Sequence, residues 1–168
     1  MPPTDTQGPG QTHAPTPVAS PPLPWSDALL LGYPKMDAEH REFVQLVGLL
    51  QTAPDVELGA HLAAFEAHAR RHFGTEDAWM ESTAFPPRDC HQKEHAAVLQ
   101  SLEEVQALHA AFGRCDVVRS FADELARWFP GHADYLDSAL AAWMSKRRHG
   151  GRPVVLKRHA ATPYTHPL

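Results

Sequence analysis

The pattern of apolar residues divides most of this chain into four amphipathic stretches. In each stretch apolar side chains recur at steps of three and four residues, which is the spacing of one face of an α-helix. Phe85-Pro86-Pro87 and the Gly113–Asp116 loop separate consecutive stretches, because Pro and Gly end helices. The pattern predicts helices over residues 37–52, 56–82, 88–111 and 117–146, and it predicts no strand.

Short connections between long amphipathic helices favour antiparallel neighbours. We therefore predict an all-α fold, an antiparallel up-down-up-down four-helix bundle with an N-terminal arm. Half of the 16 prolines fall in residues 1–24, which predicts a disordered Pro-rich leader. The arm carries Trp25 and three consecutive leucines, Leu29 to Leu31, which we expect to be buried. The predicted organisation is the leader over 1–24, the bundle over 25–146 and a basic flexible tail over 147–168.

Polar side chains interrupt the inward-facing apolar stripe of all four predicted helices. Residues four apart on a helix lie on one face, one turn above the other. Buried imidazoles and carboxylates need partners, and in an apolar core they find them in each other or in a metal ion. In an up-down topology these positions also fall at a similar depth in the bundle. The candidate metal ligands are His40, His72, Glu76, His91, His95, His132 and Asp137.

The type and number of these ligands favour a dinuclear site. Imidazole suits iron, zinc or copper, and a carboxylate can bridge two ions; the ligand set alone would also accept zinc or manganese. Suppose that both carboxylates bridge the two ions, that the imidazoles divide three and two between them, and that a solvent-derived group completes the bridge. One ion then keeps a vacant coordination position. Such a vacancy suits a small diatomic ligand. A carboxylate-rich ferritin-like centre is excluded, since the chain lacks the Glu-x-x-His motifs that such a centre needs.

Four segments of the sequence resemble the hemerythrin family in its bacterial single-domain form. They are WSDALLLGYPKMDAEH over 25–40, HFGTEDAWM over 72–80, HQKEH over 91–95 and WFPGHADYLD over 128–137. The resemblance covers about residues 25–145 and includes all seven candidate ligands in order. It implies a four-helix bundle with two non-haem iron ions, bridged by carboxylates and an oxo or hydroxo group, that binds O2 reversibly.

The resemblance also implies unequal ligand sets for the two irons. Three imidazoles hold one iron, two hold the other, where O2 binds, and the carboxylates bridge them. The three imidazoles are those of His91, His95 and His132, the two are those of His40 and His72, and the bridging carboxylates are those of Glu76 and Asp137.

An apolar wall around the O2 pocket is implied in the same way. Its residues are Phe43, Phe73, Trp128 and Ala133. Members of the family usually have Ile or Val at the last position, so the alanine predicts a wider pocket. Pro130-Gly131 inside the fourth helix predicts a kink, which would help to align the five-residue step from His132 to Asp137.

Two further polar residues lie near the candidate ligands in the sequence. We expect Asp37 either to hydrogen-bond a ligating imidazole or to cap the first helix. We expect His61, His68 and His109 at the surface or with local partners. For His68 an interior position remains open, because it precedes His72 by one turn on the same stripe.

Charge and composition restrict the remaining possibilities. The net charge is −5, yet residues 145–168 hold six basic residues and no acid, which leaves an acidic body unsuited to nucleic acid. No apolar run is long enough to span a membrane, and two distant free thiols fit a reducing cytoplasm. We expect an O2-binding protein for carriage, storage or delivery that is not an enzyme, with an unknown protein partner. The alternatives are an O2, redox or nitric oxide sensor, a di-iron oxidoreductase or peroxidase, and metal handling without O2 chemistry.

Overall fold

The computed structural model describes residues 22–148 and residue 150. Within this part of the chain there is no strand, so the prediction of an all-α fold is confirmed. The predicted leader up to residue 21 lies outside the described residues, as does the predicted tail beyond Arg148 apart from Gly150. The helices are α1 (Pro34–Thr52), α2 (Leu58–Ser82), α3 (Arg88–Phe112), α4 (Cys115–His132) and α5 (Ser138–Arg148), and the short turns are η1 (Asp27–Leu29), η2 (Asp55–Glu57) and η3 (Ala133–Asp137).

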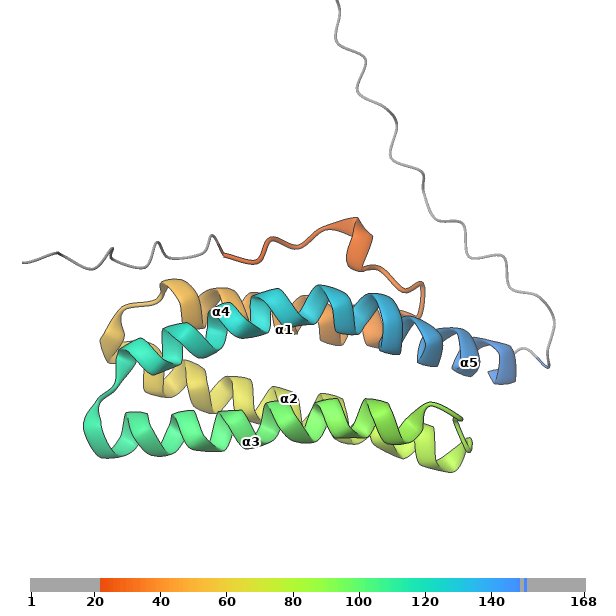
Figure 1. Cartoon of the computed structure of the whole chain (residues 1–168). Helices are drawn as coiled ribbons and strands as arrows, with labels where there is room; N and C mark the ends of the chain where they lie inside the picture. The colour runs from red at the N-terminus through yellow and green to blue at the C-terminus, as the bar shows by residue number, and fades with distance from the viewer. Residues whose placement is uncertain (1–21, 149, 151–168) are drawn as a thin grey trace, which may run out of the picture.

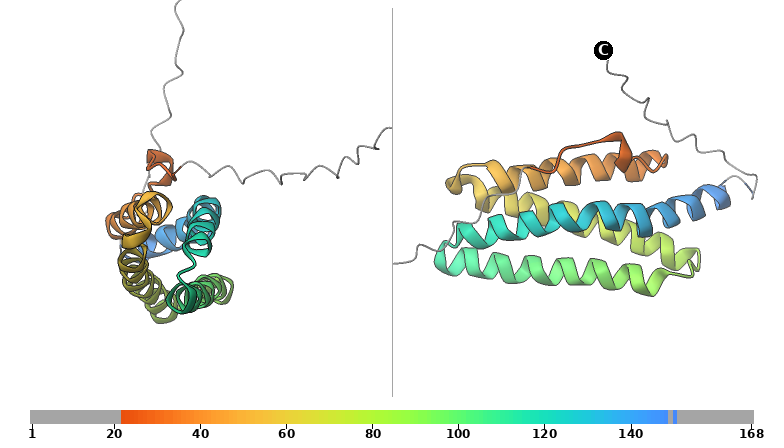
Figure 2. Two further views of the ribbon diagram at one scale, coloured as in Figure 1. Left: turned by 90° about the vertical axis from the view of Figure 1, so that its left-hand side faces the viewer. Right: turned by 45° about the horizontal axis from the view of Figure 1, so that its top comes forward.

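The described helices form a bundle in which α4, η3 and α5 run on as one rod (Figure 1). Successive rods run in opposite directions in that view. Helix α1 packs against α2 and α4, and α3 packs against the same two helices. The end-on view in Figure 2 accordingly shows these rods arranged around a common axis.

The helix ends follow local chemistry. Helix α1 begins at Pro34, three residues before the predicted start. Proline has no backbone N–H, which suits the first turn of a helix because N–H groups there have no partner within the helix. Helix α3 ends at Phe112 and is capped by Gly113, whose φ of 62° is the left-handed conformation that glycine adopts most readily. The loop to α4 is therefore short, which keeps α3 and α4 side by side.

A layer of buried polar side chains divides the apolar core into two clusters. The larger cluster extends from Phe43 on α1 to Ala133 in η3, and the smaller is centred on Met36, Met80 and Leu140. Along α1, His40 falls between Met36 and Phe43; on α2, Glu76 falls between Phe73 and Met80, and on the α4–η3–α5 rod Asp137 falls between Ala133 and Leu140. None of the helices within residues 22–148 combines the length and the apolarity that crossing a bilayer requires.

The segment before α1 lies along the bundle, next to α1 (Figures 1 and 2). Leu29 is buried and Trp25 packs against the larger core cluster, as expected, whereas the expectation of a buried Leu30 is wrong. The Leu31 N–H donates a hydrogen bond of 2.7 Å to Asp37 Oδ1. Asp37 therefore ties this segment to α1; the structure gives its carboxylate neither of the two roles predicted from the sequence.

Candidate metal centre

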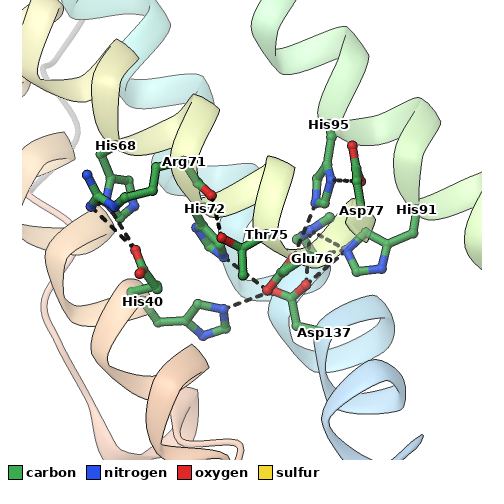
Figure 3. A network of polar contacts seen from close by, with 12 residues as sticks. His40, His68, Arg71, His72, Thr75, Glu76, Asp77, His91, His95 and Asp137 are labelled. Carbon is green, nitrogen blue, oxygen red and sulfur yellow. Dashed lines mark hydrogen bonds and ion pairs between the residues drawn. The ribbon is translucent and has the colours of Figure 1, made fainter. Parts of the chain in front are cut away.

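Each rod of the bundle brings polar side chains to one level of the core, where they point at one another (Figure 3). Helix α1 supplies one such residue, α2 two and α3 two, and the α4–η3 segment supplies the last two. On α2 and α3 the paired residues are four apart and share a face. All are buried: His40, His72, Glu76, His91, His95, His132 and Asp137. The structure thus brings together every ligand candidate taken from the sequence.

The turn η3 explains the five-residue step between the last two of these residues. It is one turn of π-helix, in which the Ser138 N–H bonds to the Ala133 carbonyl five residues earlier. A π turn holds one residue more than an α turn between hydrogen-bonded groups, so His132 and Asp137 face the same interior space. The α-helix continues through Pro130 and Gly131 to His132, and the irregular turn follows them.

Three imidazoles gather on one side of the two carboxylates; we call them the three-histidine group (His91, His95 and His132). Asp137 Oδ1 lies 3.0 Å from His91 Nε2 and 3.2 Å from His132 Nε2. Glu76 Oε2 lies 3.5 Å from His95 Nε2 and 3.6 Å from His91 Nε2. Each carboxylate therefore presents one oxygen to this group.

The two remaining imidazoles, the two-histidine group, face the other oxygens of the same carboxylates. His40 Nε2 lies 3.1 Å from Asp137 Oδ2, and His72 Nε2 lies 3.1 Å from Glu76 Oε1. Each carboxylate thus spans both groups, with one oxygen toward each. This is the arrangement in which carboxylates bridge two metal ions.

Several buried polar atoms in this layer lack a hydrogen-bond partner among the described residues. They include His40 Nε2, His95 Nε2, Glu76 Oε2 and both carboxylate oxygens of Asp137. Burying such atoms without a partner costs about 1–3 kcal/mol each, and more for charged groups. Cations among them would remove that cost, and two sets of these ligand atoms are compact enough to hold an ion each. The residues fit a pair of divalent cations.

The pKa values of two groups in this layer show that it favours positive charge. Burial alone would raise the pKa of Asp137, but the imidazoles of His132, His40 and His91 beside its carboxylate outweigh burial and hold the pKa well below its usual value. Burial likewise opposes the protonation of His95, yet the hydrogen bond to Asp77 and the nearby carboxylate of Glu76 raise its pKa to about 9. Divalent ions would take the place of these protons.

Two carboxylates outside the layer orient imidazoles within it. The Nδ1 atom of His95 lies 2.9 Å from Asp77 Oδ1, and that of His132 lies 2.9 Å from Glu94 Oε2. The sequence analysis missed both acids, although each adjoins a candidate ligand in the sequence. Such hydrogen bonds leave Nε2 free for a metal and increase its basicity.

Aromatic rings enclose the layer. Phe73 stacks on His95 with ring centroids 4.1 Å apart, and Trp128 lies 4.2 Å from His132 while its indole N–H donates to Glu94. Phe129 was missed in the sequence analysis. It packs edge-on against His40 at 5.0 Å and stacks on Phe43 at 4.3 Å.

The expected wall residues thus adjoin the layer to different degrees. Phe43, Phe73 and Ala133 are buried, and Trp128 is half-buried. That these residues line a pocket for O2 stays a prediction.

His68 has an interior position. It is 1% exposed, and its ring lies 5.4 Å from that of His72 and 6.2 Å from that of Phe43. On its outer side Nδ1 approaches Arg71 and Glu42. Of the two possibilities that the sequence left open for His68, the structure supports the interior one.

Comparison with known proteins agrees with this geometry. The family model described as "Hemerythrin HHE cation binding domain" matches residues 31–144. A curated protein of Ralstonia nicotianae, described as "Bacteriohemerythrin", is 39% identical over 127 residues; the match covers 76% of this chain and 92% of that protein.

Proposed function

The chain belongs to the hemerythrin family, and on that premise we propose that it binds O2 reversibly at a pair of non-haem iron ions. One observation carries the proposal: two buried carboxylates each turn one oxygen toward the three-histidine group and the other oxygen toward the two-histidine group. This division supports a dinuclear centre with unequal coordination, in which one ion keeps a position for a small ligand.

The ligand roles follow from the distances. We propose that the three-histidine group holds one iron and the two-histidine group holds the other. Glu76 and Asp137 would lie between the two irons and could bridge them, since each turns one oxygen toward each group. The irons, when bound, supply the electrons and the open position for O2. The chain supplies the donors and fixes their orientation, with Asp77 and Glu94 holding two of the imidazoles.

The surroundings of the centre support carriage of O2 over turnover. Phe43, Phe73, Phe129 and Ala133 are buried, and they present apolar groups at the level of the ligands. An apolar enclosure limits the access of water and protons to the centre, which slows the irreversible loss of bound O2 as peroxide. We therefore propose storage or delivery of O2 as the role. Both cysteines, Cys90 and Cys115, are free thiols, which supports the cytoplasm as its location.

The test begins with the metal content of the full-length protein. Reconstitution with ferrous ion should give two irons per chain, and air should produce a visible absorption band that disappears when O2 is removed. His91→Ala should lose iron, because it deletes a donor that contacts both carboxylates. The matched control is His61→Ala, since His61 is half-buried elsewhere on α2 and pairs with Glu57 rather than with the ligand layer. Fewer than two irons per wild-type chain, or equal iron contents in the two variants, would contradict the proposal.

A further inference from the structure

A groove between α3 and α4 lies beside the metal centre and is lined mainly by apolar side chains. These include Val98 and Val105 on α3 and Phe121 and Leu125 on α4, and the groove has a volume of about 480 Å³. Volumes of this order are typical of clefts that hold a ligand. Leu108, at one end of the groove, is 39% exposed. Because contact between apolar side chains and water is unfavourable, the groove indicates an occupant with apolar groups.

The charged side chains that line the groove are all acidic. They are Glu94, Glu104 and Glu124. Arg127 forms an ion pair of 2.6 Å with Glu124, but Glu94 and Glu104 have no Lys or Arg partner among the described residues. A second copy of the same face would place acids against acids, which disfavours a symmetric dimer at this groove. The groove instead suits a segment with apolar and basic side chains and no acid.

The sequence that follows α5 has this composition. Residues 151–168, which the structure does not describe, contain three Lys or Arg residues, one tyrosine and no acid. The segment also starts from a suitable place, because α5 continues the α4 rod that forms one side of the groove (Figure 1). Gly150 has a φ of 64° and Gly151 follows it, and two glycines allow the chain to turn back along that rod.

The distance along the rod selects the residues that can reach the groove. Trp128 marks the near end of the groove and precedes Arg148, the last residue of α5, by 20 positions. That separation corresponds to about 30 Å of helix. An extended chain covers about 3.3 Å per residue. Lys157 and Arg158 are therefore the first basic residues of the segment that can reach Glu94 at this end.

We propose that residues 157–168 dock in this groove and run back along α4. Lys157 and Arg158 pair with Glu94 at the near end, and Tyr164 packs on the apolar side chains at the far end. The inference goes beyond the proposed function, because docking requires neither iron nor O2.

The far end of the groove suits Tyr164. Leu108 and Val117 lie there, about 16 Å along α4 from Trp128. Tyr164 follows Arg158 by six positions, and six extended residues cover about 20 Å. Tyrosine can bury its ring against apolar side chains and keep its hydroxyl in water.

At the near end the docked segment meets the metal centre. Glu94 accepts the indole N–H of Trp128 and lies 2.9 Å from Nδ1 of His132, a proposed iron ligand. The segment therefore contacts the centre through the carboxylate that orients one of its imidazoles.

Nuclear Overhauser effects test the docking directly. The full-length protein is measured metal-free or loaded with zinc, since both forms are diamagnetic. Cross-peaks between the Tyr164 ring and the methyl groups of Leu108 or Val117 are expected, because such peaks require close contact.

Two charge variants test the pairing at the near end. Arg158→Glu should abolish these cross-peaks, because it places an acid against Glu94. Arg152→Glu is the matched control and should keep them, since Arg152 can reach only about 13 Å from the end of α5 and stays short of the groove. Both substitutions lie outside the bundle core, so neither threatens folding.

Three results would overturn the inference. The first is the absence of cross-peaks between residues 157–168 and the groove in the wild type, and the second is equal cross-peaks in the two charge variants. The third is cross-peaks between labelled and unlabelled chains in a mixture, which would mean that the segment docks on a second copy. None of these measurements depends on iron content or O2 binding, so the inference and the proposed function fail separately.

Discussion

Replacing Ala133 with isoleucine tests whether the ligand pocket is wide at this point. Ala133 is 1% exposed, begins the π turn η3 and directly follows His132. The substitution adds three carbons next to a proposed iron ligand. The added carbons either fill free space or collide with a packed core, and these two situations differ in the sign of the stability change.

The magnitudes separate the two cases. In free space the added carbons bury apolar surface worth about 0.8 kcal/mol each, or about 2 kcal/mol in all. The lower helix propensity of isoleucine subtracts about 0.5 kcal/mol. A net gain of about 1.5 kcal/mol in the free energy of unfolding is expected if the pocket is wide. A core that is already packed would instead lose about 1–3 kcal/mol through overpacking.

Urea unfolding of the iron-loaded protein measures the stability, and loss of the oxygenated spectrum over time measures autoxidation. We expect Ala133→Ile to be more stable than wild type and to autoxidise more slowly, because the added carbons fill space that water would otherwise enter. The control is Ala122→Ile, a buried alanine on α4 three turns before the site, which should lose stability and keep the autoxidation rate. A destabilised Ala133→Ile with an unchanged or faster autoxidation rate would refute the wide-pocket reasoning.

Three further predictions address the carboxylates. Glu94→Gln should weaken metal binding at the three-histidine group by roughly 10- to 100-fold, the usual effect of removing the partner of a metal-ligating histidine; chelator competition measures it, and an unchanged affinity would rule out a role for this acid. Glu76→Gln should lower the iron content below two per chain, because an amide bridges two cations poorly; two irons in this variant would argue against bridging by Glu76. In the metal-free protein, burial lowers the pKa of His95, but Asp77 and Glu76 raise it to about 9. Protonated His95 should therefore add stability that is fully present below about pH 6.5 and is lost as the pH rises through about 9. The urea midpoint of the wild type should therefore fall more steeply over that range than the midpoint of Asp77→Asn, and parallel profiles would contradict this assignment.

The helices and the ligand candidates could be predicted because both depend on periodicity. A histidine that replaces an apolar residue on an inward stripe, as His72 does, is visible in the sequence. Partners that approach from another helix are not visible in that way. Glu94 lies on α3 and orients His132 on α4, and Glu42 on α1 faces His68 on α2. These pairs depend on how the helices are rotated against each other, which short-range spacing does not determine.

The π turn is a similar case on a smaller scale. Its five-residue step does not fit one face of a straight α-helix, so the sequence indicated an irregularity but not its kind or place. Proline at 130 directed the prediction to Pro130-Gly131, but the α-helix continues through these residues to His132 and the irregular turn begins at Ala133. The π turn contains one residue more than an α turn, and this extra residue allows His132, Asp137 and Leu140 all to face inward. The requirement to direct a carboxylate between two groups of imidazoles accounts for this irregular turn.

The outer hydrogen bonds of the imidazoles are distributed unequally between the two groups. In the three-histidine group, His95 and His132 each have a carboxylate at Nδ1. In the two-histidine group, the Nδ1 atoms of His40 and His72 have no partner among the described residues. A carboxylate partner makes an imidazole a stronger donor to a metal and holds its orientation. We therefore expect the three-histidine group to bind an ion more tightly than the two-histidine group, because its donors are both more numerous and stronger. With fewer and weaker donors, the two-histidine group is the one at which we expect a small ligand to change the coordination of the proposed ion.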